Sequence, residues 1–562
     1  MPVSLYEWTA GWLIVLLGEL FAPVYRRAKV TTVPEFCEKR FGPGTRVLVS
    51  ALSLIACIVT KISASIFAGG ILLRVVAGWD LWTSVPIIIV TTGLYTIGGG
   101  LEAVMYTDVL QACIFVLGGL GGLAIALQRV GGFGEMARTL QRAGLDQHLH
   151  LVRPVDDVSN PTTGIFSGLL IASVWYWCVD QVIVQRVLSA RSLAHARAGC
   201  AATDYAKLLP PLMMVVPGII ARALYERCRM DGTGAEQLDG CWCTARLNEP
   251  DAANAAYPEL IVREFPPGMV GLMISAMVCA MMSSLSSIFT VDVYHRFLRP
   301  DASERELLWC GRIATAATCV IALLWLPVLS QQRGEFYLIV QNASSHIAPA
   351  LATVVLLGIM WPRVNSRAAF AGLLSGSVLG LAAYGVNLAF EHECRAAVVG
   401  TTIGGPQLAC LHFLHVAVFL CAVTLAVTVA LTLVDTPPPP SVTRDTTVQW
   451  ATCLWASRPD SNLSPHVQMA DHDHDHTEDC HGLSVEHFPA AAAAPAAVPR
   501  EVAVSWTRVA TPPALGSIDA TVSVKPTRDA SDWVDSNIGQ VFVHVASAAL
   551  IVIVAVLVVV FR

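Results

Sequence analysis

The sequence predicts an all-α polytopic membrane protein, and three observations carry that prediction. Hydrophobic residues make up 54% of the 562-residue chain and charged residues only 14%, whereas soluble domains carry about 25% charged residues. The mean hydropathy is +0.59. Apolar runs long enough to cross the roughly 30 Å hydrocarbon core of a bilayer recur along the chain. Helices are the expected spanning element, because backbone polar groups must be satisfied within each segment.

About twelve runs reach the length of about 20 apolar residues that a spanning helix needs. In chain order they lie near 5–25, 47–78, 81–98, 101–128, 164–186, 200–224, 268–294, 307–329, 335–361, 367–390, 410–434 and 538–561. We therefore expect a membrane core of eleven helices over residues 1–435 and a last membrane helix within 538–562.

Basic residues in the short loops predict the orientation. Six Lys and Arg residues fall between positions 26 and 46, and the positive-inside bias assigns such a loop to the cytoplasm. The N-terminus then lies outside. On this topology Cys228, Cys241 and Cys243 face an oxidising exterior, where we expect Cys228 to pair with one of the other two and Cys394 to remain a competing partner.

The segment 436–537 differs sharply in composition from the spans. It opens with four prolines, contains an alternating Asp/His run and continues into Ala/Pro repeats. Such a composition buries no core, so we expect a disordered cytoplasmic loop. His472, His474 and His476 are weak candidates for a metal site, and a solvated low-complexity tract is the favoured alternative.

Charge and motif content exclude several classes of protein. The net charge is −6, which argues against a basic nucleic-acid-binding protein. The cysteines are scattered singly, without a CxxC…CxxC metal pattern. We expect a lipid bilayer as a partner, no nucleic acid, no cofactor and no enzymatic activity.

Ionisable side chains inside the predicted spans are costly, at about 2.5–3.5 kcal/mol each at a span centre, and therefore point to function. Those that stand out are Glu7, Glu19, Lys61, Asp108, Asp180 and Lys207. Glu7 and Lys61 lie near span ends, where snorkelling is an alternative. Lys207 lies one turn after Asp204, and an ion pair between these two that only holds helices together is the alternative there.

Three further stretches are typical of ligand-lining surface. Residues 175–181 combine three aromatics with a carboxylate and an amide, which suits a polyhydroxylated ligand; an interfacial aromatic belt is the alternative. Residues 341–346 are an uncharged hydrogen-bonding run in an apolar span. Residues 283–287 hold four serines, whose hydroxyls are hard ligands for alkali cations, although serines also allow close helix packing.

These residues carry a resemblance to the sodium/glucose cotransporter group of the sodium:solute symporter family. The matching stretches are Trp175–Cys178 with Asp180–Arg186, Gly99–Asp108, Thr60–Ala64, Ala280–Tyr294 and Trp361–Phe370. The similarity runs in register from about residue 5 to about 434. It implies a LeuT-like inverted-repeat transporter with a sugar and sodium as partners, sodium being the coupling ion, in the plasma membrane.

The resemblance also assigns roles to single residues. It implies sugar contacts at Glu7, Ser173, Tyr176, Trp177, Lys207, Gln341 and Ser344. It implies sodium contacts at Ala280, Ser283 and Ser284, with Asp108 serving cation passage. Three of the six costly ionisable residues, Glu7, Asp108 and Lys207, are thus residues that the resemblance connects with transport.

Three departures from the family pattern stand out. The sequence begins where the family's second core helix begins, so the two N-terminal helices are expected to be lacking. The span 268–294 is about seven residues shorter than the family's, between Phe289 and Thr290. Glu19 replaces a tryptophan.

The expected function is sodium-coupled symport of a neutral, glucose-like sugar by alternating access. A polyol such as inositol, or another solute, is the first alternative. The second is a non-transporting sugar sensor, which the missing helices favour.

Overall fold

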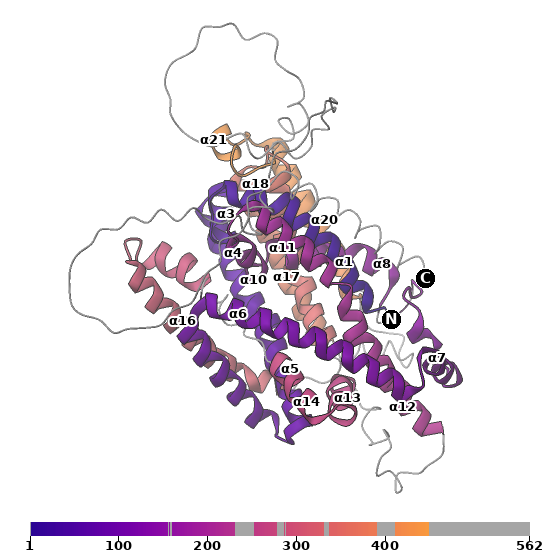
Figure 1. The fold of residues 1–562 in the computed structure, drawn as a ribbon. Helices are drawn as coiled ribbons and strands as arrows, with labels where there is room; N and C mark the ends of the chain where they lie inside the picture. The colour runs from indigo at the N-terminus through magenta and orange to yellow at the C-terminus, as the bar shows by residue number, and fades with distance from the viewer. Residues whose placement is uncertain are drawn as a thin grey trace, which may run out of the picture. The chain divides into compact units, whose positions relative to one another are not determined.

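The computed structural model describes residues 2–448 apart from 156, 158–159, 231–251, 278–285, 287, 331–335 and 391–410. These residues belong to one compact unit, and all the regular secondary structure in them is helical (Figure 1). Ten helical segments of this part are long and apolar enough to cross a membrane. They are Ser4–Arg27, Pro43–Ala77, Leu81–Gly99, Met105–Val130, Thr162–Val179, Leu193–Met230, Glu304–Pro327, Phe336–Met360, Ser366–Ala389 and Phe413–Val434.

The ten segments correspond to ten of the twelve predicted spans. The predicted span 538–561 lies outside the described residues, as does the middle of 268–294. The sequence-based prediction of an all-helical, multi-pass membrane protein is therefore confirmed. The rest of 436–537 beyond residue 448, with His472, His474 and His476, also lies outside the described residues.

Four of the spans are built from α-helical pieces and short π-helical turns, which are frequent at functional sites. The first span is α1 (Ser4–Leu16), η1 (Leu17–Phe21) and α2 (Ala22–Arg27), and the second is α4 (Pro43–Ala56), η2 (Cys57–Ile62) and α5 (Ser63–Ala77). The fifth is α8 (Thr162–Gly164), η4 (Ile165–Leu169), α9 (Leu170–Val174) and η5 (Trp175–Val179), and the sixth is α11 (Leu193–Ala206), η6 (Pro211–Val215) and α12 (Val216–Met230).

The remaining helices are continuous. They are α3 (Val33–Phe41), α6 (Leu81–Val130), α7 (Phe133–Arg142), α10 (Gln181–Leu188), α13 (Ala256–Glu264), α14 (Pro267–Met277), η8 (Phe289–Leu298), α16 (Glu304–Ser330), α17 (Phe336–Met360), α18 (Ser366–Ala389), α20 (Phe413–Val434) and α21 (Pro440–Thr443), with short 3₁₀ turns at η3 (Asp146–Leu149) and η7 (Ala252–Ala255).

Two predicted boundaries differ from the structure. The spans expected at 81–98 and 101–128 are joined in the single helix α6, which at 50 residues is about 75 Å long. Three glycines, Gly98–Gly100, lie at the junction, but glycine lowers helix stability only modestly and does not by itself end a helix. Conversely, the span expected at 164–186 is broken at Asp180, whose backbone is extended.

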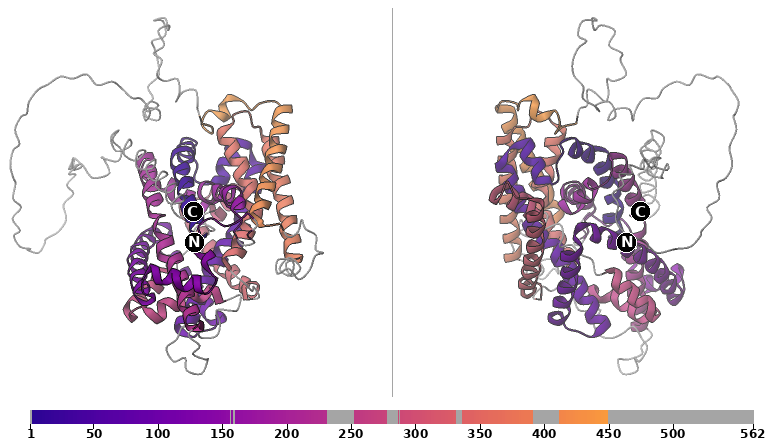
Figure 2. Two further views of the ribbon diagram at one scale, coloured as in Figure 1. Left: turned by 90° about the vertical axis from the view of Figure 1, so that its right-hand side faces the viewer. Right: turned by 60° about the vertical axis from the view of Figure 1, so that its left-hand side comes forward.

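Among the ten described spans, α17 is the most deeply buried by its neighbours. It contacts α18 and α20, and these two run side by side (Figure 2, orange). Close approach is possible because Gly372 and Gly376 of α18 leave room for the side chains of Thr428 and Thr424, which a Cβ at either glycine would overlap. The result is a rigid support for the residues that α17 presents.

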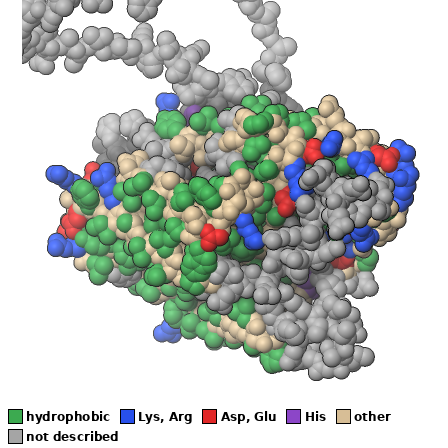
Figure 3. All heavy atoms as spheres, turned by 90° about the horizontal axis from the view of Figure 1, so that it is seen from below, with side chains coloured by type: hydrophobic (Ala, Val, Ile, Leu, Met, Phe, Trp, Pro, Cys, Tyr) green, Lys and Arg blue, Asp and Glu red, His purple; other side chains and the backbone are tan. Residues whose placement is uncertain are grey.

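Large apolar side chains are exposed along α6 and α16, including Leu94, Leu117 and Leu324, each at least 67% exposed. Figure 3 shows hydrophobic side chains spread over a broad area, with most charged side chains near its margins. Soluble monomers rarely expose an apolar area this extensive. The exposed apolar side chains therefore agree with an integral membrane protein.

The cysteine prediction is met at one position. Cys228 at the end of α12 is disulfide-bonded. The cysteines considered as its partners, Cys241, Cys243 and Cys394, lie outside the described residues.

Candidate functional site

Three of the predicted sugar-contact residues meet where α1, η5 and the end of α11 come together. Lys207 Nζ lies 2.5 Å from Glu7 Oε2 and 4.7 Å from the centroid of the Trp177 ring. α11 ends at Ala206, with Lys207 as its C-cap residue, because Pro210 and Pro211 follow and proline supplies no N–H for a continuing helix. The ion pair that the sequence suggested between Lys207 and Asp204 is not formed, since Lys207 pairs with Glu7.

A second ion pair lies beside the first. Lys61 Nζ in η2 is 2.6 Å from Asp180 Oδ2 and 4.6 Å from the ring centroid of Tyr176. The Lys61 and Asp180 side chains are only 5% and 8% exposed. The interpretation of Lys61 as a snorkelling residue is therefore wrong.

Local backbone geometry explains this second pair. The π-helical turn η5 holds Tyr176 and Trp177 edge to face, with their ring centroids 5.0 Å apart. The chain then becomes extended at Asp180, whose Oδ1 accepts a hydrogen bond from Val182 N at 2.8 Å and so begins α10. One carboxylate thus caps a helix and neutralises a lysine. We call Glu7, Lys61, Tyr176, Trp177, Asp180 and Lys207 the central cluster.

The predicted residues of α17 lie less directly on this cluster. Gln341 Nε2 donates to Tyr337 Oη at 3.0 Å, and the Tyr337 ring packs edge to face on Tyr6 at 5.8 Å between centroids. Ser344 Oγ donates to Val340 O within its own helix at 2.8 Å. Gln341 is therefore linked to the cluster through two tyrosines, one of them adjacent to Glu7.

Sequence reasoning missed both of these tyrosines. A signal for them was present, because Tyr6 precedes Glu7 and Tyr337 lies one helical turn before Gln341. The remaining sugar-contact prediction, Ser173, is buried in α9, which packs against α17.

The predicted sodium residues are only partly described. Ala280, Ser283 and Ser284 lie outside the described residues. Asp108, expected to serve cation passage, forms an ion pair with Arg186 of α10, with Asp108 Oδ2 and Arg186 Nη2 2.8 Å apart.

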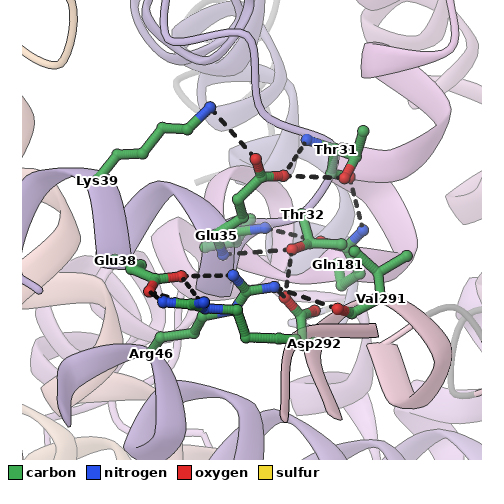
Figure 4. Close-up of polar contacts among 11 residues, drawn as sticks. Thr31, Thr32, Glu35, Glu38, Lys39, Arg46, Gln181, Val291 and Asp292 are labelled. Carbon is green, nitrogen blue, oxygen red and sulfur yellow. Dashed lines mark hydrogen bonds and ion pairs between the residues drawn. The ribbon is translucent and has the colours of Figure 1, made fainter. Parts of the chain in front are cut away.

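A third group of charged residues joins α3, α4 and η8 (Figure 4). Arg46 at the start of α4 reaches Asp292 Oδ1 at 2.8 Å and Glu38 Oε2 at 2.5 Å. Thr32 Oγ1 also donates to Asp292 Oδ1, at 2.7 Å, while Arg296 binds the other side of Glu38. We call Thr32, Glu38, Arg46, Asp292 and Arg296 the Arg46 network.

The N-terminal end of α3 ties this network to α10. Gln181 Oε1 accepts from Val33 N at 3.0 Å, and Gln181 Nε2 donates to Thr31 O at 3.3 Å (Figure 4). A cavity of about 400 Å³ adjoins these contacts, with Thr31, Gln181 and Thr290 in its wall. Gln181 directly follows Asp180, so the broken fifth span connects the central cluster to the Arg46 network.

Electrostatics favour ionised carboxylates on α3, which lies outside the spans. Burial acts to raise the pKa of Glu38, but hydrogen bonds from Arg296 and Arg46 outweigh it and hold that pKa below its usual range. Burial likewise opposes ionisation of Glu35, and hydrogen bonds from Thr31 with the charge of Lys39 lower its pKa overall. Both carboxylates therefore stay charged and paired at neutral pH.

The central cluster suits a neutral ligand. Its two lysines are balanced by two carboxylates, so no charge is left over to recognise an ionic solute. The ring faces of Tyr176 and Trp177 and the polar groups of Glu7 and Lys207 offer stacking and hydrogen bonding together. In the part of the chain that the structure describes, no group of three His, Cys, Asp or Glu residues is placed to hold a metal.

The fold and this site define a helical membrane transporter. A profile of the Sodium:solute symporter family matches residues 1–376. The chain belongs to this family, which consists of transporters and not enzymes.

Known proteins sharpen this assignment. The chain is 38% identical to sodium/glucose cotransporter 4 of Danio rerio over 464 residues, which cover 78% of this chain and 69% of the relative. It is also 38% identical to the sodium/myo-inositol cotransporter of Homo sapiens over 484 residues, with 80% and 66% covered. The chain spans about two thirds of the length of these relatives.

The fold itself matches a solved transporter. A substrate-bound, outward-open sodium-coupled sialic acid symporter superposes with a TM-score of 0.59 at 18% identity, covering 77% of this chain and 84% of that one. A likeness at this identity concerns the fold alone, and it confirms the predicted LeuT-like architecture.

Proposed function

We propose that this protein is a sodium-coupled symporter of a neutral, glucose-like sugar. The observation that carries the proposal is the charge-balanced central cluster with Tyr176 and Trp177 beside it, in a chain of the symporter family. The curated relatives are named for the transport of glucose and myo-inositol with sodium, and both solutes are neutral and polyhydroxylated.

Each residue of the cluster has a proposed role. Trp177 and Tyr176 cover a face of the sugar ring, since C–H-rich sugar faces pack on aromatic rings. Lys207 donates to one sugar hydroxyl while Glu7 accepts from another, each giving up part of its contact with the other. Gln341 reaches the sugar from α17 with Ser344 nearby, and Ser173 supports the site from α9.

Sodium is proposed to bind at Ala280, Ser283 and Ser284, with Asp108 on its path. Moving one charge through 100 mV is worth about 2.3 kcal/mol, so an inward sodium gradient can concentrate a neutral solute. We also propose the plasma membrane as the location, an external N-terminus, and a cytoplasmic position for residues 436–537 ahead of a last membrane helix in 538–562.

Uptake into proteoliposomes tests the proposal. The purified chain is reconstituted, and labelled glucose uptake is measured with an inward sodium gradient and with choline replacing sodium. We expect accumulation above the bath concentration only with sodium, with competition by unlabelled glucose. Binding without accumulation would favour the sensor alternative, and stronger competition by myo-inositol than by glucose would favour the polyol.

A matched pair of variants connects the activity to the cluster. Trp177→Leu removes the aromatic face and should raise the KM for glucose at least tenfold, whereas Trp177→Phe keeps a ring and should lose less. Equal KM values in both variants and the wild type would show that the sugar binds elsewhere.

A further inference from the structure

The helices α1 and α11 run antiparallel and meet layer by layer. Glu7 of α1 pairs with Lys207 of α11, and the last layer pairs Glu19 of η1 with Arg197 of α11, whose Nε lies 3.4 Å from Glu19 Oε2. Two further layers lie between these ion pairs, and in each of them a glycine of the first span faces a residue of α11: Gly11 faces Asp204 and Gly18 faces Cys200. A Cβ at Gly18 would lie 3.0 Å from Cys200 Cβ, and a Cβ at Gly11 would overlap Asp204.

The Asp204 layer is the unusual one. The Asp204 residue is only 2% exposed, and its Oδ2 is buried and accepts no hydrogen bond from the described residues. Its Oδ1 occupies the space that a side chain at Gly11 would need, so the carboxyl group lies directly against the backbone of α1. Asp204 is thus a buried acid aimed into a helix interface, one turn from Lys207.

The charged groups around Asp204 are engaged elsewhere. The elements packed on α11 are α1, η1, α2 and α10. Three ion pairs are formed by these elements and α11 itself: Glu7 with Lys207, Glu19 with Arg197, and Arg186 with Asp108. Further titratable groups form hydrogen bonds: Arg26 with the carbonyls of Ala190 and Arg191, Arg27 with the carbonyl of Thr447, Tyr25 with the carbonyl of Cys178, and His195 with Ser192. Cys200 adds a thiol one turn before Asp204.

A carboxylate in this position has two ways to avoid an unpaired buried charge. It can hold a metal cation, which takes a cage of several oxygen ligands, or it can take up a proton, which needs only the carboxylate itself. Such a cage is not formed around Asp204, because its Oδ1 lies against the backbone of Gly11 and its Oδ2 has no hydrogen-bond partner among the described residues. The proton is the ligand that the site fits.

We propose that Asp204 is a proton-binding site between α1 and α11. The carboxyl group is neutral in the conformation described here. It gives its proton to water when α1 and α11 part far enough to hydrate it, leaving a carboxylate one turn from the Glu7–Lys207 pair. Sugar transport then depends on pH through a residue outside the sugar contacts; this consequence rests on the proposed function, whereas proton binding itself does not.

Thermal unfolding of the purified protein in detergent tests proton binding without any transport. A fold that keeps an acid protonated binds more protons than the unfolded chain, so its stability is full at low pH and falls as the pH rises. Asp204→Asn is neutral at every pH and nearly the same shape. We expect its unfolding midpoint to match the wild type below the ordinary aspartate pKa, at about pH 3.5, and to exceed it increasingly toward about pH 8.

Glu19→Gln is the matched control, because Glu19 is an acid of the same interface that has an arginine partner. Removing its charge should lower the midpoint at neutral pH, the opposite sign to Asp204→Asn. A constant offset between Asp204→Asn and the wild type at all pH values, or a lower midpoint of the variant at about pH 8, would overturn the proposal.

Transport provides the second readout. With the sodium gradient held fixed, wild-type glucose uptake should change with pH between about 5 and 8, and Asp204→Asn should flatten that profile while Glu19→Gln retains it. Superimposable profiles of Asp204→Asn and the wild type would overturn the transport consequence. A wild type without any uptake would contradict the proposed function instead, and the unfolding experiment would still decide whether Asp204 binds a proton.

Discussion

The central cluster and the Arg46 network both bury charged side chains, but they differ in how many partners each charge has. In the central cluster Lys61 has one carboxylate and Lys207 has one. In the Arg46 network Arg46 binds Glu38, Asp292 and the carbonyl of Val291, while Glu38 is also held by Arg296. Single pairs leave hydrogen-bonding capacity for a solute, whereas the shared network fixes three elements to one another.

Burial sharpens the contrast within the cluster itself. The Lys61–Asp180 pair is nearly inaccessible, while Glu7 and Lys207 are 33% and 20% exposed. We infer that Lys61 and Asp180 shape the broken span and that Glu7 and Lys207 meet the sugar. Variants at these positions therefore separate stability from binding.

The largest effect is expected from breaking the inaccessible pair. Lys61→Met leaves the Asp180 carboxylate buried without its counter-charge, which should cost about 3–5 kcal/mol of stability. The double variant Lys61→Met/Asp180→Asn removes both charges and keeps a cap for α10, so it should recover most of the loss. Thermal unfolding in detergent measures both; a double variant as unstable as the single one would contradict this view of the pair.

A smaller loss is expected from the network, because its charges share partners. Arg46→Met leaves Asp292 with Thr32 and leaves Glu38 with Arg296, and we expect a cost of about 2–3 kcal/mol. Arg46→Lys keeps the positive charge but loses the forked donor geometry of the guanidinium group. Its stability should therefore lie between those of Arg46→Met and the wild type. If Arg46→Met were as stable as the wild type, the network would not be fixing these elements.

Gln341→Leu should affect binding without affecting folding. Leucine is favourable in a membrane helix, so expression and the unfolding midpoint should stay near wild type. Loss of one neutral hydrogen bond is worth about 1 kcal/mol, which corresponds to roughly a fivefold weaker affinity for glucose. Equilibrium binding of labelled glucose measures the change, and an unchanged affinity would remove Gln341 from the site.

Acid should loosen the Arg46 network slightly. The pKa of Glu38 is lowered in the fold, since the hydrogen bonds from Arg296 and Arg46 outweigh burial. Its stabilising contribution is therefore present above the ordinary glutamate pKa and is lost as the pH falls through the lowered value. Unfolding midpoints from about pH 6 down to about pH 3 should fall less steeply in Glu38→Gln than in the wild type, and Glu135→Gln, which alters an exposed pair on α7, should leave the slope unchanged.

The sequence predicted the membrane architecture well because hydropathy reports directly on burial in lipid. It also identified Glu7, Lys61, Asp180 and Lys207 from their cost in a span, and the structure pairs them. It did not predict which acid each lysine would take, because Lys207 and Glu7 are 200 positions apart and nothing local links them. The sequence offered a pair of Lys207 with its near neighbour Asp204 only as an alternative, and the structure does not form it.

The positions at which helices break or continue were the second feature that the sequence did not predict. The break at Asp180 depends on a side chain that caps the next helix while it binds Lys61, a contact between distant segments. The continuous helix through 81–130 shows the converse, because hydropathy indicates two separate spans there and the structure joins them in one helix. The sequence also did not predict the Arg46 network, because the basic residues of the short loops indicate only the orientation of the chain and not their partners.

One comparison tests most directly whether the central cluster binds sugar while the Arg46 network holds the fold. Lys207→Met and Arg46→Met are measured side by side for the KM of sodium-driven glucose uptake and for the unfolding midpoint. We expect Lys207→Met to raise the KM at least tenfold with a midpoint near wild type, since a hydrogen bond from a charged group is worth about 1.5–3 kcal/mol. We expect Arg46→Met to lower the midpoint and to leave the KM of the folded fraction unchanged. The reverse pattern, or both effects together in both variants, would contradict this division of roles between the two regions.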